Sequence, residues 1–216
     1  MKKFWCGLVC ASIAGIILAR GRRNNRSLLR TAVPTLNAVG AIAIFRRLSH
    51  GNTLRFTFVP AMAVSWALYM AVLRKRMPDG LKITPLYMFA LAWQFVHFLE
   101  EYLTGFQYRW PVEIFEAKPY PDRQFVAINV GSYTLFVLSG IALLKSVPEF
   151  VMPAVFFVVM GVVGNGIQHP IYSVMVRGYF PGLWTSIPNL IIGPILLRQL
   201  LSGTSGPTVA HPALAR

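Results

Sequence analysis

Acidic residues are scarce in this sequence. Only seven aspartates and glutamates occur among 216 residues, against 21 lysines and arginines, and charged residues make up 13% of the chain. A soluble domain usually carries about 25% charged residues, whereas 55% of this chain is hydrophobic. The apolar residues form long blocks, which a soluble chain of this size could not hide from water. The composition therefore excludes an ordinary soluble domain and predicts an all-α membrane protein, because helices satisfy their own backbone in lipid.

Cysteine is rarer still, with only Cys6 and Cys10, both inside the first apolar block. Neither a CxxC pair nor a His-rich tract accompanies them, so we predict neither a disulfide framework nor a cysteine-based zinc site. The chain also lacks a phosphate-binding glycine loop, a GxSxG elbow, an HExxH helix and a haem attachment motif. The well-known signatures of nucleotide-dependent, serine-hydrolase, zincin and c-type haem chemistry are therefore missing.

The net charge of +14 does not indicate nucleic-acid binding. Basic residues follow apolar blocks, as at 20–26 and 74–76, and no module of interleaved basic and aromatic residues occurs. Lysine and arginine in these places mark cytoplasmic loops and contacts with anionic headgroups. We therefore expect the lipid bilayer, and not DNA or RNA, as the partner of a multi-pass protein of the cell membrane. The same rule makes the segment 84–103 run from the cytoplasm outward.

Seven apolar segments predict a bundle of about six or seven helices. They are residues 4–19, 32–45, 56–73, 84–103, 125–144, 149–176 and 183–201. The first segment precedes five arginines, so we interpret it as an uncleaved anchor and not as a signal peptide. The second is shorter than the ~20 residues of a usual span, so it could span, re-enter or lie at the interface.

The segments divide into three predicted regions. Residues 1–83 form an N-terminal hydrophobic helical region, 84–201 a four-helix membrane domain, and 202–216 a tail. The tail is rich in Gly, Ser, Pro and Thr, and we expect it to be disordered. The loop at 104–124 holds aromatic residues among mixed charges, so we expect it to lie against the membrane surface and cap the helix ends.

Three ionisable residues interrupt the apolar segment 84–103. His97 precedes Glu100 and Glu101 by three and four residues in WQFVHFLEEYL, which places all three near one face of a helix. An ionisable group in a membrane segment is costly and normally faces a bundle interior or a watery cavity. The structural alternative is that both glutamates reach the headgroup region and that His97 only bonds a neighbouring helix.

A second polar set lies in the two segments that follow. Asn165 and His169 have i, i+4 spacing within GNGIQHPIYS, and Asn129 adds an amide in the segment 125–144. Such amides also serve simply as glue between membrane helices. We expect the two sets to converge in the core of a four-helix bundle, as catalytic or metal-binding residues with polar support: His97, Glu100, Glu101 and His169, supported by Asn129 and Asn165.

His97-Phe98-Leu99-Glu100-Glu101 is a His-x-x-Glu-Glu signature, and with it the chain resembles the HXXEE-motif membrane proteins. Similar residues follow in order: Trp110, Asn129, Asn165, His169, and the stretch from Arg177 to Thr185, which is similar to the family's Tyr-x-Pro-Gly-hydrophobic-x-Thr. The resemblance covers about residues 84–201. It implies a small bacterial integral membrane bundle without an assigned activity, and it supplies no substrate.

Three kinds of function fit these residues. An enzyme would act on a lipid or isoprenoid substrate, either by proton transfer or with one Zn, Fe or Mn ion as cofactor. A transporter would bind a proton or cation at the glutamates, with the segment 149–176 as a discontinuous helix, although no internal repeat supports this. A structural protein would use the polar residues to fix helix pairing or an oligomer. The sequence leaves all three open and favours the enzyme.

Overall fold

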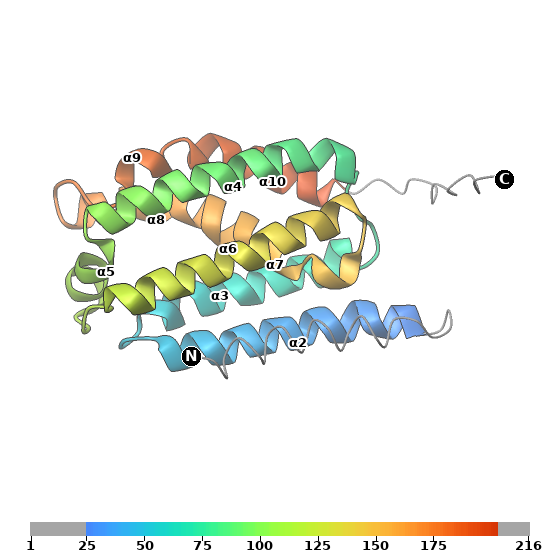
Figure 1. The fold of residues 1–216 in the computed structure, drawn as a ribbon, viewed down its shortest axis with the longest axis horizontal. Coiled ribbons are helices and arrows are strands. Elements are labelled where there is room, and N and C mark those ends of the chain that lie inside the picture. Colours follow the sequence, from blue (N-terminus) through green and yellow to red (C-terminus); the bar gives the residue numbers. More distant parts are fainter. Residues whose placement is uncertain (1–24, 203–216) are drawn as a thin grey trace.

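The computed structural model describes residues 25–202, and all regular structure in that range is helical. Residues 1–24 and 203–216 are not described, so the predicted anchor with its two cysteines and nearly all of the predicted tail fall outside. The long helices run side by side as rods (Figure 1): α2 (Asn25–Leu48), α3 (Thr53–Leu68) continued by η1 (Tyr69–Leu73), α4 (Gly80–Leu103), α6 (Asp122–Leu144), the run α7 (Met152–Phe156), η4 (Phe157–Gly164) and α8 (Asn165–Met175), and α10 (Asn189–Leu201). Short connecting elements are α5 (Phe106–Arg109), η2 (Trp110–Ile114), η3 (Pro148–Phe150) and α9 (Leu183–Ser186).

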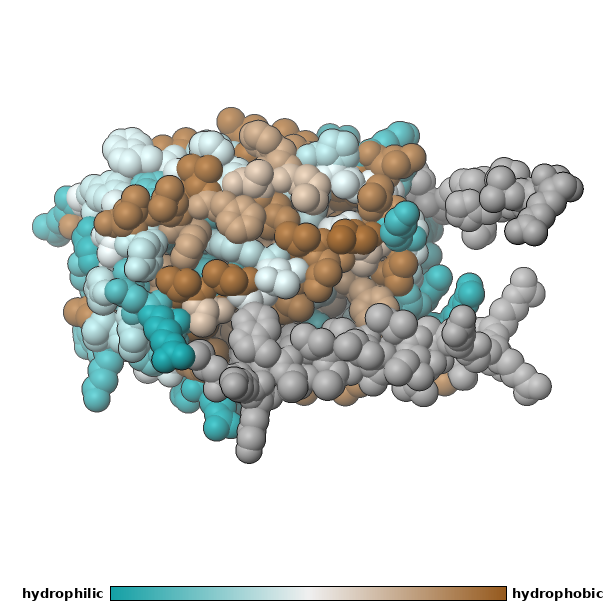
Figure 2. Space-filling view, viewed as in Figure 1, coloured by the Kyte–Doolittle hydropathy of each residue, from teal (hydrophilic) through white to brown (hydrophobic). Residues whose placement is uncertain are grey.

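Four of the described helical rods are long and apolar enough to cross a membrane. They cover Arg26–Leu48, Thr53–Leu73, Asp122–Leu144 and Met152–Met175. The helix α4 has 24 residues, which is about 36 Å, and packs along α6. Apolar side chains cover much of the face shown in Figure 2. Leu81, Val174 and Ile191 are among the large hydrophobic residues that are exposed. The predicted all-helical, multi-pass membrane protein is thereby confirmed.

The helix α2 is longer than the apolar block that predicted it. The apolar block runs from residue 32 to residue 45. The helix runs from Asn25 to Leu48 and carries arginines in its first and last turns. Charged residues can extend a membrane helix to the headgroup level, so the apolar block underestimates its length. This helix packs on α3, where the indole nitrogen of Trp66 donates to the Thr35 hydroxyl at 3.0 Å.

The run from α7 to α8 forms the centre of the bundle. Nearly all side chains from Val151 to Val158 are buried, on every side of the helix, as expected of a helix surrounded by others. Glycine and proline suggested a break in this segment, but the chain stays helical from Met152 to Met175, with π-helical geometry over Phe157–Gly164. The discontinuous helix that a transporter would have in this segment is therefore not seen between Met152 and Met175.

The start of α4 lies against the end of α6. A Cβ atom at Gly80 would lie 2.6 Å from the carbonyl oxygen of Leu143 and 2.8 Å from that of Leu144. Because these are backbone atoms, Gly80→Ala must push the helices apart, and we expect it to lower the free energy of unfolding by about 1–3 kcal/mol. Thermal unfolding in detergent measures this effect. Gly40→Ala is the control, since a Cβ there meets no atom of residues 25–202 within 4 Å, and equal midpoints for the two variants would contradict the close approach.

Candidate functional site

Three ionisable side chains meet where α4 and α8 approach each other. His97 and Glu101 lie one turn apart on α4, His169 projects from α8, and all three are buried. Oε1 of Glu101 lies 3.5 Å from His97 Nε2 and 3.3 Å from His169 Nε2. The two imidazole rings are nearly perpendicular, with their centroids 4.7 Å apart. We call these three residues the histidine–glutamate cluster.

Hydrogen bonds determine which nitrogen of each histidine carries the hydrogen. His169 Nδ1 lies 2.6 Å from the carbonyl oxygen of Pro181, which can only accept, so His169 donates from Nδ1. His97 Nδ1 lies 2.7 Å from the hydroxyl of Thr185, and that hydroxyl donates to Glu100. The hydroxyl must therefore accept from His97. In the neutral form of each ring the lone pair of Nε2 then faces Glu101, and in the protonated form Nε2 donates toward it.

The cluster has the dimensions of a metal site. Lone pairs from two rings and a carboxylate repel one another unless protons or a cation lie between them. Metal–ligand bonds of ~2.0–2.1 Å in a tetrahedron separate the ligand atoms by about 3.3 Å, close to the 3.3 and 3.5 Å between Glu101 and the two histidines. One ligand atom from each residue falls within a group 4.8 Å across. The three residues can hold one metal ion, or they can share protons.

Glu100 faces a different partner. Its carboxylate accepts hydrogen bonds from the Tyr179 hydroxyl at 2.8 Å, the Trp184 amide at 3.2 Å, and both the amide, at 2.8 Å, and the hydroxyl of Thr185. These donors belong to residues 179–185, which we call the clamping segment. Pro181 and Thr185 of the same segment bond the two histidines. Of the four predicted ligand candidates, Glu100 thus lies outside the cluster. It binds the clamping segment, and that segment orients the two histidines of the cluster.

Gly182 brings the clamping segment against the histidines. Its backbone has φ +85° and ψ 0°, in the left-handed region that glycine adopts easily. A Cβ atom there would lie 2.5 Å from Cε1 of His169 and 2.9 Å from Cε1 of His97. The Pro-Gly step therefore has a packing role, because the segment can lie this close only when position 182 has no side chain.

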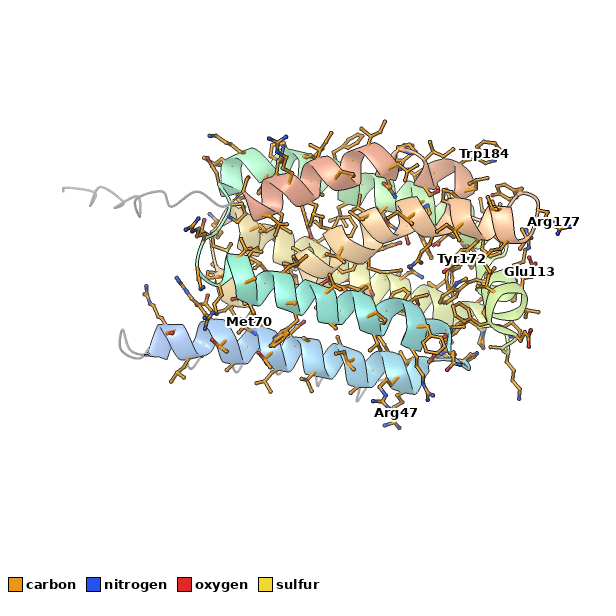
Figure 3. All side chains as sticks on the ribbon, turned by 180° about the vertical axis from the view of Figure 1, so that it is seen from behind. Arg47, Met70, Glu113, Tyr172, Arg177 and Trp184 are labelled. Carbon is orange, nitrogen blue, oxygen red and sulfur yellow. The ribbon has the colours of Figure 1, made fainter. Side chains whose placement is uncertain are left out.

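The loop at 104–124 covers this end of the bundle. The ring of Phe106 lies 5.3 Å from that of His169, and Arg109 donates to the Tyr179 carbonyl at 3.2 Å. Arg109 also hydrogen-bonds Glu113 at 2.6 and 2.9 Å, and these bonds lower the pKa of the Glu113 carboxyl. In Figure 3 Glu113, Tyr172 and Trp184 gather at this end. The loop caps the helix ends, while its predicted position on the membrane surface stays a prediction.

A cavity of about 90 Å³ lies beside the cluster, with Glu101 and His169 in its wall. Most of the wall is aromatic or aliphatic, and a few polar side chains interrupt it: Gln94, Asn129, Ser132, Asn165 and Gln168. We predicted from the sequence that Asn129 and Asn165 lie near the histidines, and both line this cavity. A water molecule needs at least ~10–15 Å³ of such volume, so the cavity is large enough for several waters or the reactive end of a substrate, but not for a whole lipid.

Sequence reasoning did not assign roles to Thr185, Pro181 and Gly182. The only signal was the resemblance of residues 177–185 to a family stretch, which gave no reason for its pattern. The structure explains this pattern, because the segment contacts both histidines and Glu100. Glu100 and Thr185, which are hydrogen-bonded, are more than 80 residues apart in the sequence. Spacing within one helix cannot reveal such a contact.

Comparison with known proteins gives one family. The family described as protein of unknown function with HXXEE motif matches residues 87–197, which is a little more than half of the chain. No match is found among curated proteins or among solved structures. The matched range contains the histidine–glutamate cluster, Glu100 and the clamping segment. With its several candidate spans and buried polar cluster, this multi-pass membrane chain belongs to the HXXEE-motif family.

Proposed function

We propose that the protein is an integral membrane enzyme that binds one divalent metal ion with His97, Glu101 and His169 and acts there on a lipid-soluble substrate. The observation that carries the proposal is the convergence of the Nε2 atoms of two buried histidines on one buried carboxylate. The other nitrogen of each ring donates to Thr185 or Pro181. Histidines that bind metals in proteins are usually oriented in this way by a hydrogen bond from the second nitrogen.

The ligand set narrows the choice of metal. Two imidazoles and one carboxylate suit Zn, Fe or Mn, and the separations of 3.3 and 3.5 Å fit the tetrahedral geometry that zinc prefers. Three protein ligands leave a position open, as in catalytic sites. When bound, such an ion supplies a Lewis acid that polarises a carbonyl or phosphoryl oxygen.

The residues of the cavity support a lipid or isoprenoid substrate. Asn129 and Asn165 offer amides that can orient one polar group beside Glu101, while Phe125 and Phe136 line an apolar wall that excludes water. Three helical rods that line the cavity, Thr53–Leu73, Asp122–Leu144 and Met152–Met175, are candidate membrane spans, so an apolar substrate can reach it from the bilayer. Because the cavity admits only the reactive end, the remainder of the molecule would stay in the lipid.

Proton transfer without a metal is the alternative form of the same enzyme. Glu101 and the two histidines would then share protons, and the site would work in metal-free protein. A proton- or cation-coupled transporter gains no support from the structure, because the helical run Met152–Met175 is continuous. A purely structural role predicts that the cluster tolerates conservative replacement.

Metal content tests the proposal. We expect wild-type protein, purified without a histidine tag or chelator, to carry about one Zn, Fe or Mn per chain in elemental mass spectrometry. His169→Ala removes a ligand and should leave less than about a tenth of that metal. The control is His50→Ala, because His50 bonds the carbonyls of Lys118 and Pro119 and lies outside the cluster. Wild type that is metal-free and does not take up added zinc would leave proton transfer as the mechanism.

A further inference from the structure

A second charged feature lies at the opposite end of α4 from the histidine–glutamate cluster. The first turns of α2 and the two residues that follow η1 form a hollow of about 350 Å³ on the surface. Its lining consists of four cationic side chains and one hydroxyl: Arg26, Arg30, Arg74, Lys75 and Ser27. Both contributing rods are candidate membrane spans, Arg26–Leu48 and Thr53–Leu73. The hollow therefore lies at the ends of two spans, where lipid headgroups are found.

The positive charge of the hollow is only partly neutralised. Among the described residues, Glu149 approaches it, with Oε1 3.6 Å from Arg30 Nε, and Arg74 donates to the Thr31 hydroxyl at 3.2 Å. The Nε atoms of Arg30 and Arg74 are buried and have no hydrogen-bond partner in that part of the chain. One carboxylate thus faces four cations.

The undescribed segments cannot supply the missing negative charge from their side chains. All seven acidic residues of the chain lie between residues 79 and 149. The charged residues within 1–24 are all basic, and three of them are Arg20, Arg22 and Arg23. Asp79, the other acidic residue near this end, caps α4 and lies 3.7 Å from Lys82. The excess of positive charge is therefore a property of the sequence as well as of the hollow.

We propose that this hollow binds the phosphate group of an anionic phospholipid. Guanidinium groups present several N–H donors in a plane that matches phosphate oxygens, and three arginines line this hollow. Basic residues at the ends of spans mark the cytoplasmic side, where the leaflet carries anionic lipids. Because the hollow lies at the ends of two spans, the phosphate of a lipid headgroup is at the same depth in the membrane as the hollow. Free phosphate shares this chemistry, so the test separates the two sources.

Lipid binding to the full-length protein in neutral detergent tests the site. Short-chain phosphatidylglycerol, short-chain phosphatidylcholine and inorganic phosphate are titrated separately, with native mass spectrometry and thermal shift as readouts. We expect phosphatidylglycerol to bind best. The double variant Arg30→Gln/Arg74→Gln should weaken its binding by about twenty-fold, since each cation near an anionic surface contributes roughly a five-fold factor.

The matched control is Arg46→Gln/Arg47→Gln, which removes two arginines from the opposite end of α2 and should leave phosphatidylglycerol binding unchanged. Equal weakening in both double variants would show general surface attraction and overturn the site. Unchanged binding in Arg30→Gln/Arg74→Gln, or inorganic phosphate binding as tightly as the lipid, would overturn it too. If that variant does not fold, Arg26→Gln/Lys75→Gln, at two exposed positions, takes its place with the same expected direction. None of these results depends on metal at the histidine–glutamate cluster.

Discussion

Gly182→Ala is expected to release the metal from the proposed site and to destabilise the protein. Position 182 has φ +85°, where a residue with a Cβ costs about 1–2 kcal/mol. The new Cβ would also lie 2.5 Å from His169 and 2.9 Å from His97, so both rings must move. Metal ligands need positions accurate to about 0.5 Å. We therefore expect zinc affinity to fall by about 100-fold, as when the partners that orient ligands are lost.

Competition with a chelating dye measures the zinc affinity of this variant, and thermal unfolding in detergent measures its stability. Gly178→Ala is the matched control, because it lies just before the clamping segment and a Cβ there meets no described residue within 4 Å. That control should bind zinc like the wild type. If Gly182→Ala also bound zinc like the wild type, the clamping segment would not lie against the histidines as described.

The apolar segments predicted the helices because a membrane helix must be apolar over the lipid thickness. The segment 84–103 corresponds to α4, which begins earlier, at Gly80, because the Asp79 side chain caps it by accepting from the Leu81 amide. The last predicted segment is divided into two helices at Pro188, because α9 ends at Ser186 and α10 begins at Asn189. Helix ends thus depended on caps and charges that hydropathy does not record.

The candidate site was predictable only in part. The i, i+4 spacing correctly indicated that His97 and Glu101 share a helix face, and the second polar set indicated His169. The same argument placed Glu100 with them, because three and four residues of separation differ by only part of a turn. The structure turns Glu100 toward Thr185, whose hydroxyl connects it to His97. That difference depends on where α9 lies, which no pattern within α4 contains.

The two adjacent glutamates are expected to give different results when each is changed to glutamine. Glu101→Gln removes the carboxylate of the cluster and its charge. Structural zinc sites yield about 10–16 kcal/mol from four ligands, so one ligand carries roughly 3 kcal/mol, or about two orders of magnitude in affinity. Glu101→Gln should therefore lose its metal during purification, as measured by elemental mass spectrometry.

Glu100→Gln should keep the metal but bind it about ten-fold more weakly, because Glu100 acts through the clamping segment and touches no ligand atom of the cluster. A glutamine keeps the shape but replaces one acceptor oxygen by an NH2 donor, which then faces either the Trp184 amide at the Oε1 position or the Thr185 amide at the Oε2 position. Hydrogen exchange at these two amides should accelerate in Glu100→Gln and not in Glu101→Gln. Equal metal loss in both variants would make Glu100 a ligand as well, whereas full metal retention in Glu101→Gln would remove the cluster from consideration as the metal site.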